Sequence, residues 1–115
     1  MLPLDHVEIL EYLELDGRSP YAEWFNRLNP SAAAKVAVAL ARLSQGNFSS
    51  VKSVGSGVQE YRINFGPGYR MYFGRDGERV LLLLGGGTKK RQQKDIADAL
   101  GRWLDYKLRK KQGIR

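Results

Sequence analysis

Arginine and lysine side chains gather in residues 60–96, at positions where they could bind a phosphate group. Arg62 and Arg70 lie in two apolar-rich runs, and the cluster Lys-Lys-Arg at 89–91 follows a third run after Gly-Gly-Gly-Thr. We expect that cluster to open a helix, where the positive end of the macrodipole disfavours cations. A helix start also carries unpaired backbone N–H groups, which bind anions. The pattern therefore predicts a phosphate site.

The residue types that are absent or rare narrow the chemistry further. The chain has no cysteine, which excludes disulfides, thiolate metal sites and a cysteine nucleophile. His6 is the only histidine, so a paired-histidine nuclease site is excluded and a histidine-based metal site is not expected. The segment GGGTKK lacks the GxxxxGK[ST] pattern, which argues against nucleotide hydrolysis. We predict a site without metal or cofactor.

Charge is distributed unevenly along the 115 residues. The formal net charge is +7 at pH 7, but residues 1–30 carry −4, so the remainder carries +11. Such an excess favours an anionic polymer as partner, most commonly nucleic acid, although a basic surface without a ligand is the alternative. The longest apolar run, residues 80–84, is too short to span a membrane, and the N-terminus lacks a signal-peptide layout. We expect a cytoplasmic protein.

Three strands must position the arginines. Residues 58–65, 69–74 and 79–84 are apolar-rich and are separated by Gly-Pro-Gly and Asp-Gly turn signals, so they predict an antiparallel meander. Imperfect alternation over residues 7–15 predicts an earlier strand.

Three helices are expected around these strands. Ser19 and Pro20 form an N-cap and a first helical position for a helix that ends near Leu28. Further helices are predicted over residues 31–44 and 88–110, the last with one apolar side. Residues 1–115 should form a single domain. The element order predicts an α+β fold, a twisted antiparallel sheet with two N-terminal helices on one face and a C-terminal helix.

Alternation along the strands decides which side chains share a face. Glu60, Arg62 and Asn64 lie on one side of the first meander strand, and Arg70 and Tyr72 share a face of the next. Arg62 and Arg70 could meet, but two guanidiniums repel unless a phosphate or a carboxylate lies between them. Glu60 could be that carboxylate, which would make Arg62 part of a surface ion pair. We expect Arg70 to be exposed, so that its removal would leave the fold intact.

The segments VKSVGSGVQEYRINFGPGYRMYFGRDG and VLLLLGGGTKKRQQKDI, followed by a helix with Ala99 and Trp103, resemble a known family. They are similar to the RelE/ParE toxin superfamily of bacterial type II toxin–antitoxin modules, specifically its HigB-like "addiction module killer protein" branch. The similarity covers nearly the whole chain. It implies a RelE-like fold and a toxin that cleaves mRNA on the translating ribosome. It also implies a cognate antitoxin of the helix-turn-helix type, with operator DNA bound only through the antitoxin complex.

Cleavage of RNA without a metal makes three demands on the side chains. It needs a base for the ribose 2′-hydroxyl, stabilisation of charge at phosphorus and an acid for the 5′-oxygen. Without a usable histidine, Lys, Arg, Tyr or Glu must supply these roles, although their ordinary pKa values match neutral pH poorly. We therefore expect slow cleavage of free RNA and a need for the ribosome to position the substrate.

The resemblance and these demands together select the candidate residues. The catalytic candidates are Arg62, Arg70, Tyr72 and Lys89, and the candidates for RNA binding are Lys52, Lys90, Arg91 and Lys94. Tyr72 could act as an acid or stack on a base. The lysines have a simpler interpretation as a hydrated helix face and, for Lys52, as a solvated side chain beside a loop.

Two other functions stay open at this point. The same fold carries ParE-like inhibitors of DNA gyrase. A non-enzymatic nucleic-acid-binding module would also agree with the charge and with the lack of a recognisable acid–base pair. We expect Leu100, Trp103 and Leu104 to pack on the sheet; if exposed, they would instead mark a groove for the antitoxin.

Overall fold

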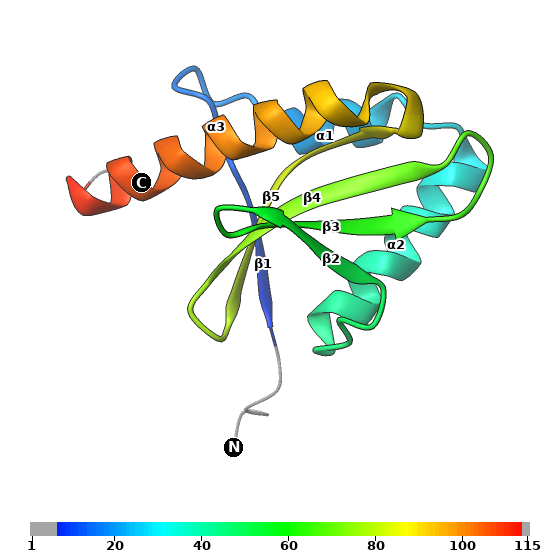
Figure 1. Ribbon diagram of the computed structural model, residues 1–115, viewed down its shortest axis with the longest axis horizontal. Coiled ribbons are helices and arrows are strands. Elements are labelled where there is room, and N and C mark those ends of the chain that lie inside the picture. Colours follow the sequence, from blue (N-terminus) through cyan, green and yellow to red (C-terminus); the bar gives the residue numbers. More distant parts are fainter. Residues whose placement is uncertain (1–6, 114–115) are drawn as a thin grey trace.

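The structure is a computed structural model that describes residues 7–113, so His6 lies outside the described residues (Figure 1). Within this described range, five strands form one twisted sheet in the order β1-β5-β4-β3-β2. The strands are β1 (Glu8–Glu11), β2 (Val51–Gly55), β3 (Val58–Ile63), β4 (Tyr69–Asp76) and β5 (Val80–Thr88). The helices are α1 (Pro20–Asn26), α2 (Pro30–Ser44), the 3₁₀ turn η1 (Lys89–Arg91) and α3 (Gln92–Lys111).

The predicted α+β fold is confirmed, with two differences in the sheet. Strands β2 to β5 form the antiparallel part, but β1 pairs in parallel with β5, from Glu8 opposite Val80 to Glu11 opposite Leu83. After β1 and the two helices, the chain enters the sheet at its far edge in β2, which runs opposite to β1. Three successive antiparallel pairings then bring β5 back in the direction of β1. Strand β2 was not predicted, since its short sequence VKSVG has little apolar alternation.

Helices cover both faces of the sheet, with α2 along one side and α3 along the other (Figure 1). The apolar run of β5 explains how both faces are buried. Leu81 and Leu83 join the core formed with α1 and α2, whereas Leu82 and Leu84 join the core under α3. Consecutive strand residues point to opposite faces, so an unbroken apolar run indicates a strand that is buried on both sides.

The starts of the two N-terminal helices agree closely with prediction. Ser19 caps α1 by accepting a hydrogen bond from the backbone N–H of Ala22 at 3.0 Å, and Pro20 occupies the first helical position. Asn29 caps α2 in the same way, so α2 begins at Pro30, one residue before the predicted start. A side-chain acceptor at the cap satisfies a backbone donor that the helix leaves unpaired.

The start of the third helix differs from prediction. Thr88 ends β5 and Lys89–Arg91 form a 3₁₀ turn, so α3 begins only at Gln92. The backbone N–H of Lys89 donates to the carbonyl oxygen of Gly68 at 2.8 Å, which holds the chain beside the β3–β4 loop before the helix begins. The basic cluster therefore precedes α3 rather than forming its first turn.

Helix α3 packs on the sheet through a core that includes Trp103. Trp103 is buried, and a Cβ atom added at Gly74 of β4 would lie 2.3 Å from its ring. Leu100 packs partly buried against the same core, but Leu104 is 56% exposed, so the expectation that Leu104 packs on the sheet was wrong. No helix within residues 7–113 is long and apolar enough to cross a membrane.

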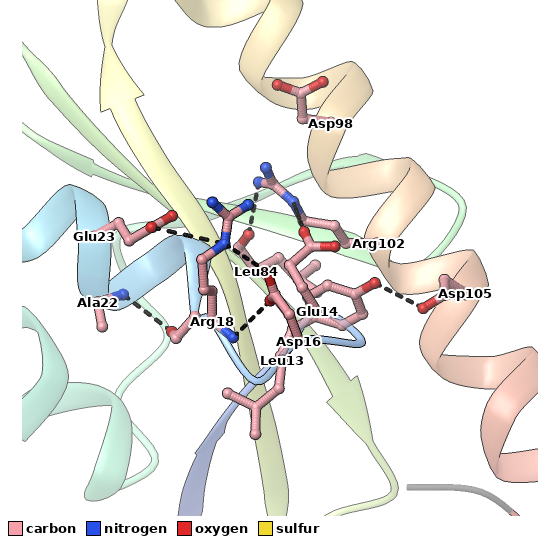
Figure 2. A network of polar contacts seen from close by, with 12 residues as sticks. Leu13, Glu14, Asp16, Arg18, Ala22, Glu23, Leu84, Asp98, Arg102 and Asp105 are labelled. Atoms are coloured by element: carbon pink, nitrogen blue, oxygen red, sulfur yellow. Dashed lines mark hydrogen bonds and ion pairs between the residues drawn. The ribbon is translucent and has the colours of Figure 1, made fainter.

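Polar contacts fix α3 over the β1 side of the sheet. Figure 2 shows Arg102 reaching from α3 to Glu14 and Leu84, where its Nη1 donates to the Leu84 carbonyl oxygen at 3.0 Å. The phenol of Tyr12 donates to Asp105 at 2.6 Å. These contacts lie near the middle and C-terminal part of α3, so the N-terminal end of α3 needs its own attachment to the sheet.

Candidate phosphate-binding site

A cluster of polar side chains attaches the N-terminal end of α3 to the sheet. It surrounds Arg62 and Arg70, which lie directly opposite each other on β3 and β4. Directly opposite residues of an antiparallel pair point to the same face. The adjacent row along the sheet contains Lys52 of β2, Glu60 of β3 and Tyr72 of β4. The predicted meeting of Arg62 and Arg70 is therefore confirmed, and it lies on the face that α3 covers.

Glu60 is the carboxylate between the two arginines, and it has no exposed surface. Its Oε1 accepts a hydrogen bond from Arg62 Nε at 2.8 Å. Its Oε2 accepts hydrogen bonds from the Tyr72 phenol at 3.0 Å and from Gln92 Nε2 of α3 at 2.9 Å. Arg70 Nε lies 3.9 Å from the same Oε2. The expected Glu60–Arg62 pair exists, but it was wrong to place its carboxylate at the surface, because the first residue of α3 covers it.

The surroundings of Glu60 favour its ionised form. Burial by itself would raise the pKa of Glu60, but the hydrogen bonds from Arg62, Gln92 and Tyr72 together lower that pKa below its ordinary value. The pKa of Tyr72 is raised, first by burial and then by the Glu60 charge, so its phenol stays neutral and donates.

Arg70 is buried, contrary to the expectation that it is exposed. Its side chain is 9% exposed, its Nη1 donates to the Gly68 carbonyl oxygen at 3.2 Å, and its Nε has no hydrogen-bond partner among the described residues. The Gly68 loop lies so close that an added Cβ would be 3.2 Å from Arg70 Nη1. A buried cation depends on its counter-charge, so Arg70 contributes to the fold as well as to the charge of the site.

Arg62 and Lys52 are the accessible cations of this part of the sheet. The Arg62 side chain is 42% exposed, and no hydrogen bond joins its two terminal nitrogens to another described residue. Lys52 is also exposed, but it lies on β2 directly opposite Glu60 and not beside a loop as expected. The guanidinium of Arg62 is thus oriented through Nε while its outer donors stay open to a ligand.

The basic turn η1 is held next to these residues from both ends. Lys89 is attached to the Gly68 loop through its backbone, and Gln92 is attached to Glu60 through its side chain. The side chains of Lys89, Lys90 and Arg91 are exposed. The site therefore unites three segments that are separate in sequence.

The positions of two predicted residues bear on the roles expected of them. Tyr72 is 1% exposed, so stacking of a base on its ring is not possible in this arrangement. Lys94 forms an exposed ion pair with Asp98 at 3.0 Å on the surface of α3. Tyr72 contacts Glu60, and Lys94 lies on an exposed face of α3, as the simpler interpretation of this lysine predicts.

Sequence reasoning missed two residues that the fold brings close. No sequence pattern marks Gln92 as a site residue, because its contact with Glu60 depends on the 3₁₀ turn that precedes it. Asp95 lies over Gly87, which is directly opposite Arg70, and an added Cβ at Gly87 would meet its Oδ2. That oxygen is buried without a hydrogen-bond partner among the described residues, and burial raises the pKa of Asp95 from its ordinary 3.8.

Carboxylates and histidines do not gather into a metal-binding arrangement in the described part of the chain, where no group of three or more such residues lies together. The described side chains offer cations, two of which contact a buried carboxylate, and such cations can bind an anion such as phosphate.

Comparison with known proteins gives two matches. The family model described as "Phage derived protein Gp49-like (DUF891)" matches residues 23–103, a range that contains every side chain of the site. An uncharacterized protein from Haemophilus influenzae (strain ATCC 51907 / DSM 11121 / KW20 / Rd) is 41% identical over 80 residues. The aligned segment covers 69% of this chain and 81% of that relative.

Proposed function

Because the chain belongs to the phage-derived Gp49-like family, toxin-like modules of the RelE class of toxin–antitoxin systems, we propose that it is a toxin that cleaves mRNA. The activity is a metal-independent endoribonuclease acting on the translating ribosome, as in the HigB-like branch. The family implies an antitoxin partner. We further propose that this antitoxin is of the helix-turn-helix type and that the toxin acts in the cytoplasm.

One observation carries the proposal: Arg62 and Arg70 are opposite each other, share the buried Glu60, and lie on the face to which Gln92 attaches the turn Lys89–Arg91. Cations that are held in place before the substrate arrives stabilise developing negative charge without reorganisation. This arrangement suits a phosphate group whose charge increases in the transition state.

The reaction follows from the residues available. The ribose 2′-oxygen attacks the adjacent phosphorus, the bond from phosphorus to the 5′-oxygen breaks, and the proton lost by the 2′-hydroxyl is balanced by one gained at the 5′-oxygen. The products are a 2′,3′-cyclic phosphate and a 5′-hydroxyl, with no water or metal consumed. Arg62 and Arg70 stabilise the charge on phosphorus, and Lys89 supplies a proton on the side of the basic turn.

The remaining predicted residues surround this centre. Lys52, Lys90 and Arg91 are exposed and contact the RNA backbone, whereas Lys94 contributes less because it is paired with Asp98. Tyr72 positions Glu60 and does not touch the substrate. Since none of these groups has an ordinary pKa near neutrality, cleavage of free RNA is slow and the ribosome supplies the positioning.

Expression without an antitoxin tests the activity. We expect growth arrest and new mRNA 5′ ends at discrete positions within translated regions, bearing 5′-hydroxyl groups. Toxin that has been purified and treated with EDTA should still cleave mRNA when it is added to ribosomes kept in magnesium buffer. A 5′-phosphate product would indicate attack by water and metal chemistry. Intact mRNA together with trapped gyrase–DNA complexes would replace the proposal with gyrase inhibition.

A further inference from the structure

A basic hollow lies beside the site, where β3 extends beyond its neighbour. Strand β2 pairs with β3 only as far as Val51 opposite Tyr61, so the β3 edge is open from Arg62 onward. A hollow of about 240 Å³ lies there between α2 and β3. Its walls include Lys35 and Arg42 from α2 and Arg62 from β3.

The charges of this hollow are of one sign. Lys35, Arg42 and Arg62 are its charged residues, and no acidic residue among residues 7–113 lines it. By contrast, the hollow of about 320 Å³ between α1 and α3 contains Glu23, Asp95 and Asp98 beside its three arginines. A concave surface lined by one sign of charge concentrates ions of the opposite sign. The hollow at β3 is therefore suited to an anion.

The same walls also offer apolar surface beside the cations. Val38 of α2 is 48% exposed, and Phe65 is partly buried with Lys35 Nζ 5.4 Å from its ring centroid. Asn64 adds an exposed amide. Proteins that bind single-stranded nucleic acid combine cations for the backbone with aromatic or apolar surface for the base or sugar.

We propose that this hollow binds one nucleotide of single-stranded RNA next to the phosphate that is cleaved. Lys35 and Arg42 contact its phosphate, and its ribose or base lies against Val38 and Phe65. Arg62 joins this subsite to the reaction centre, because its Nε is held by Glu60 while the residue also lines the hollow. The inference rests on the proposed function, since it assigns the path of the same substrate.

Salt-dependent binding of a single-stranded RNA tests the subsite. The probe is a fluorescent 2′-O-methyl RNA 12-mer, which has no free 2′-hydroxyl and so cannot be cleaved. We expect Lys35→Gln and Arg42→Gln each to reduce the slope of log K against log salt by about 0.7, or roughly four-fold in affinity at 0.15 M salt. Lys107→Gln is the matched control, because Lys107 is an exposed lysine of α3 outside this hollow. All three should keep the wild-type melting temperature.

The outcomes separate this inference from the proposed function. Slopes for Lys35→Gln and Arg42→Gln equal to that of Lys107→Gln would overturn the subsite, as would failure of the wild type to bind the 12-mer while it cleaves mRNA on ribosomes. Equal loss for a double-stranded RNA of the same length would also overturn it, in favour of a general electrostatic surface. Binding with the expected slopes but no cleavage on ribosomes would support the subsite and refute the nuclease.

Discussion

Replacing Glu60 by glutamine should destabilise the protein strongly. The substitution keeps the size of the side chain but replaces one acceptor oxygen by an N–H donor. Among the described residues, it removes the only negative charge in contact with Arg62 and Arg70. Arg70 would then remain a buried cation without a counter-charge, since its side chain is 9% exposed. Removing one partner of a buried ion pair costs about 3–5 kcal/mol. Arg62, which is 42% exposed, adds at most about 1 kcal/mol.

Urea unfolding at pH 7, followed by tryptophan fluorescence, measures this loss. A loss of that size is a large part of the roughly 5–15 kcal/mol by which domains are stable, and the melting temperature should fall by about 10–20 °C. The control is Asp98→Asn, which makes the same chemical change in the exposed pair with Lys94. An exposed helix pair of this spacing contributes about 0.3–0.5 kcal/mol.

The pH dependence gives a second test of the same residue. Because the pKa of Glu60 is lower in the folded protein than its ordinary 4.5, its ionisation contributes stability above that value. The contribution is lost as the pH falls through the folded pKa. The difference between wild type and Glu60→Gln should therefore be largest at neutral pH and shrink in acid. If Glu60→Gln proves as stable as Asp98→Asn at pH 7, the network does not hold Arg70 as described.

Three further substitutions test neighbouring parts of the site. Arg70→Ala should abolish toxicity and also lower the melting temperature, because Arg70 is buried; a toxic variant would show that it is not needed for cleavage. Tyr72→Phe should cost about 1.5–3 kcal/mol in urea unfolding, since it removes a hydrogen bond to the charged Glu60; unchanged stability would mean that solvent replaces this bond. Asp95→Asn should raise the melting temperature at pH 7 but not in acid. The pKa of Asp95 is raised in the fold, so ionisation as the pH rises costs stability; a lower melting temperature at pH 7 would contradict this.

Much of the local structure was predictable because its causes are local. Ser19 and Pro20 place a helix start through a cap and a fixed backbone angle, and α1 begins there. The meander was predictable from turn signals between apolar runs. The alternation of side chains along β3 and β4 also placed Arg62 and Arg70 on one face, with Glu60 as the possible carboxylate between them.

Other features depended on contacts between distant segments. Strand β2 has a weak pattern of its own and forms by pairing with β3. The parallel direction of β1 depends on its pairing with β5, which lies far from it in the sequence. The third helix begins only at Gln92, because the backbone N–H of Lys89 donates to the carbonyl oxygen of Gly68 and holds this segment beside the β3–β4 loop.

The sequence alone determined the fold class, the surplus of cations and their order along the chain, because composition, turns and strand alternation are properties of short segments. The tertiary structure alone decided which of those cations are buried. Helix α3 covers the end of the β3–β4 hairpin, so Glu60 and Arg70 are buried. Arg62 and Lys89 remain exposed to solvent. Burial changes the free energy of a charge more than any local pattern does, and it is set by which surface another element covers.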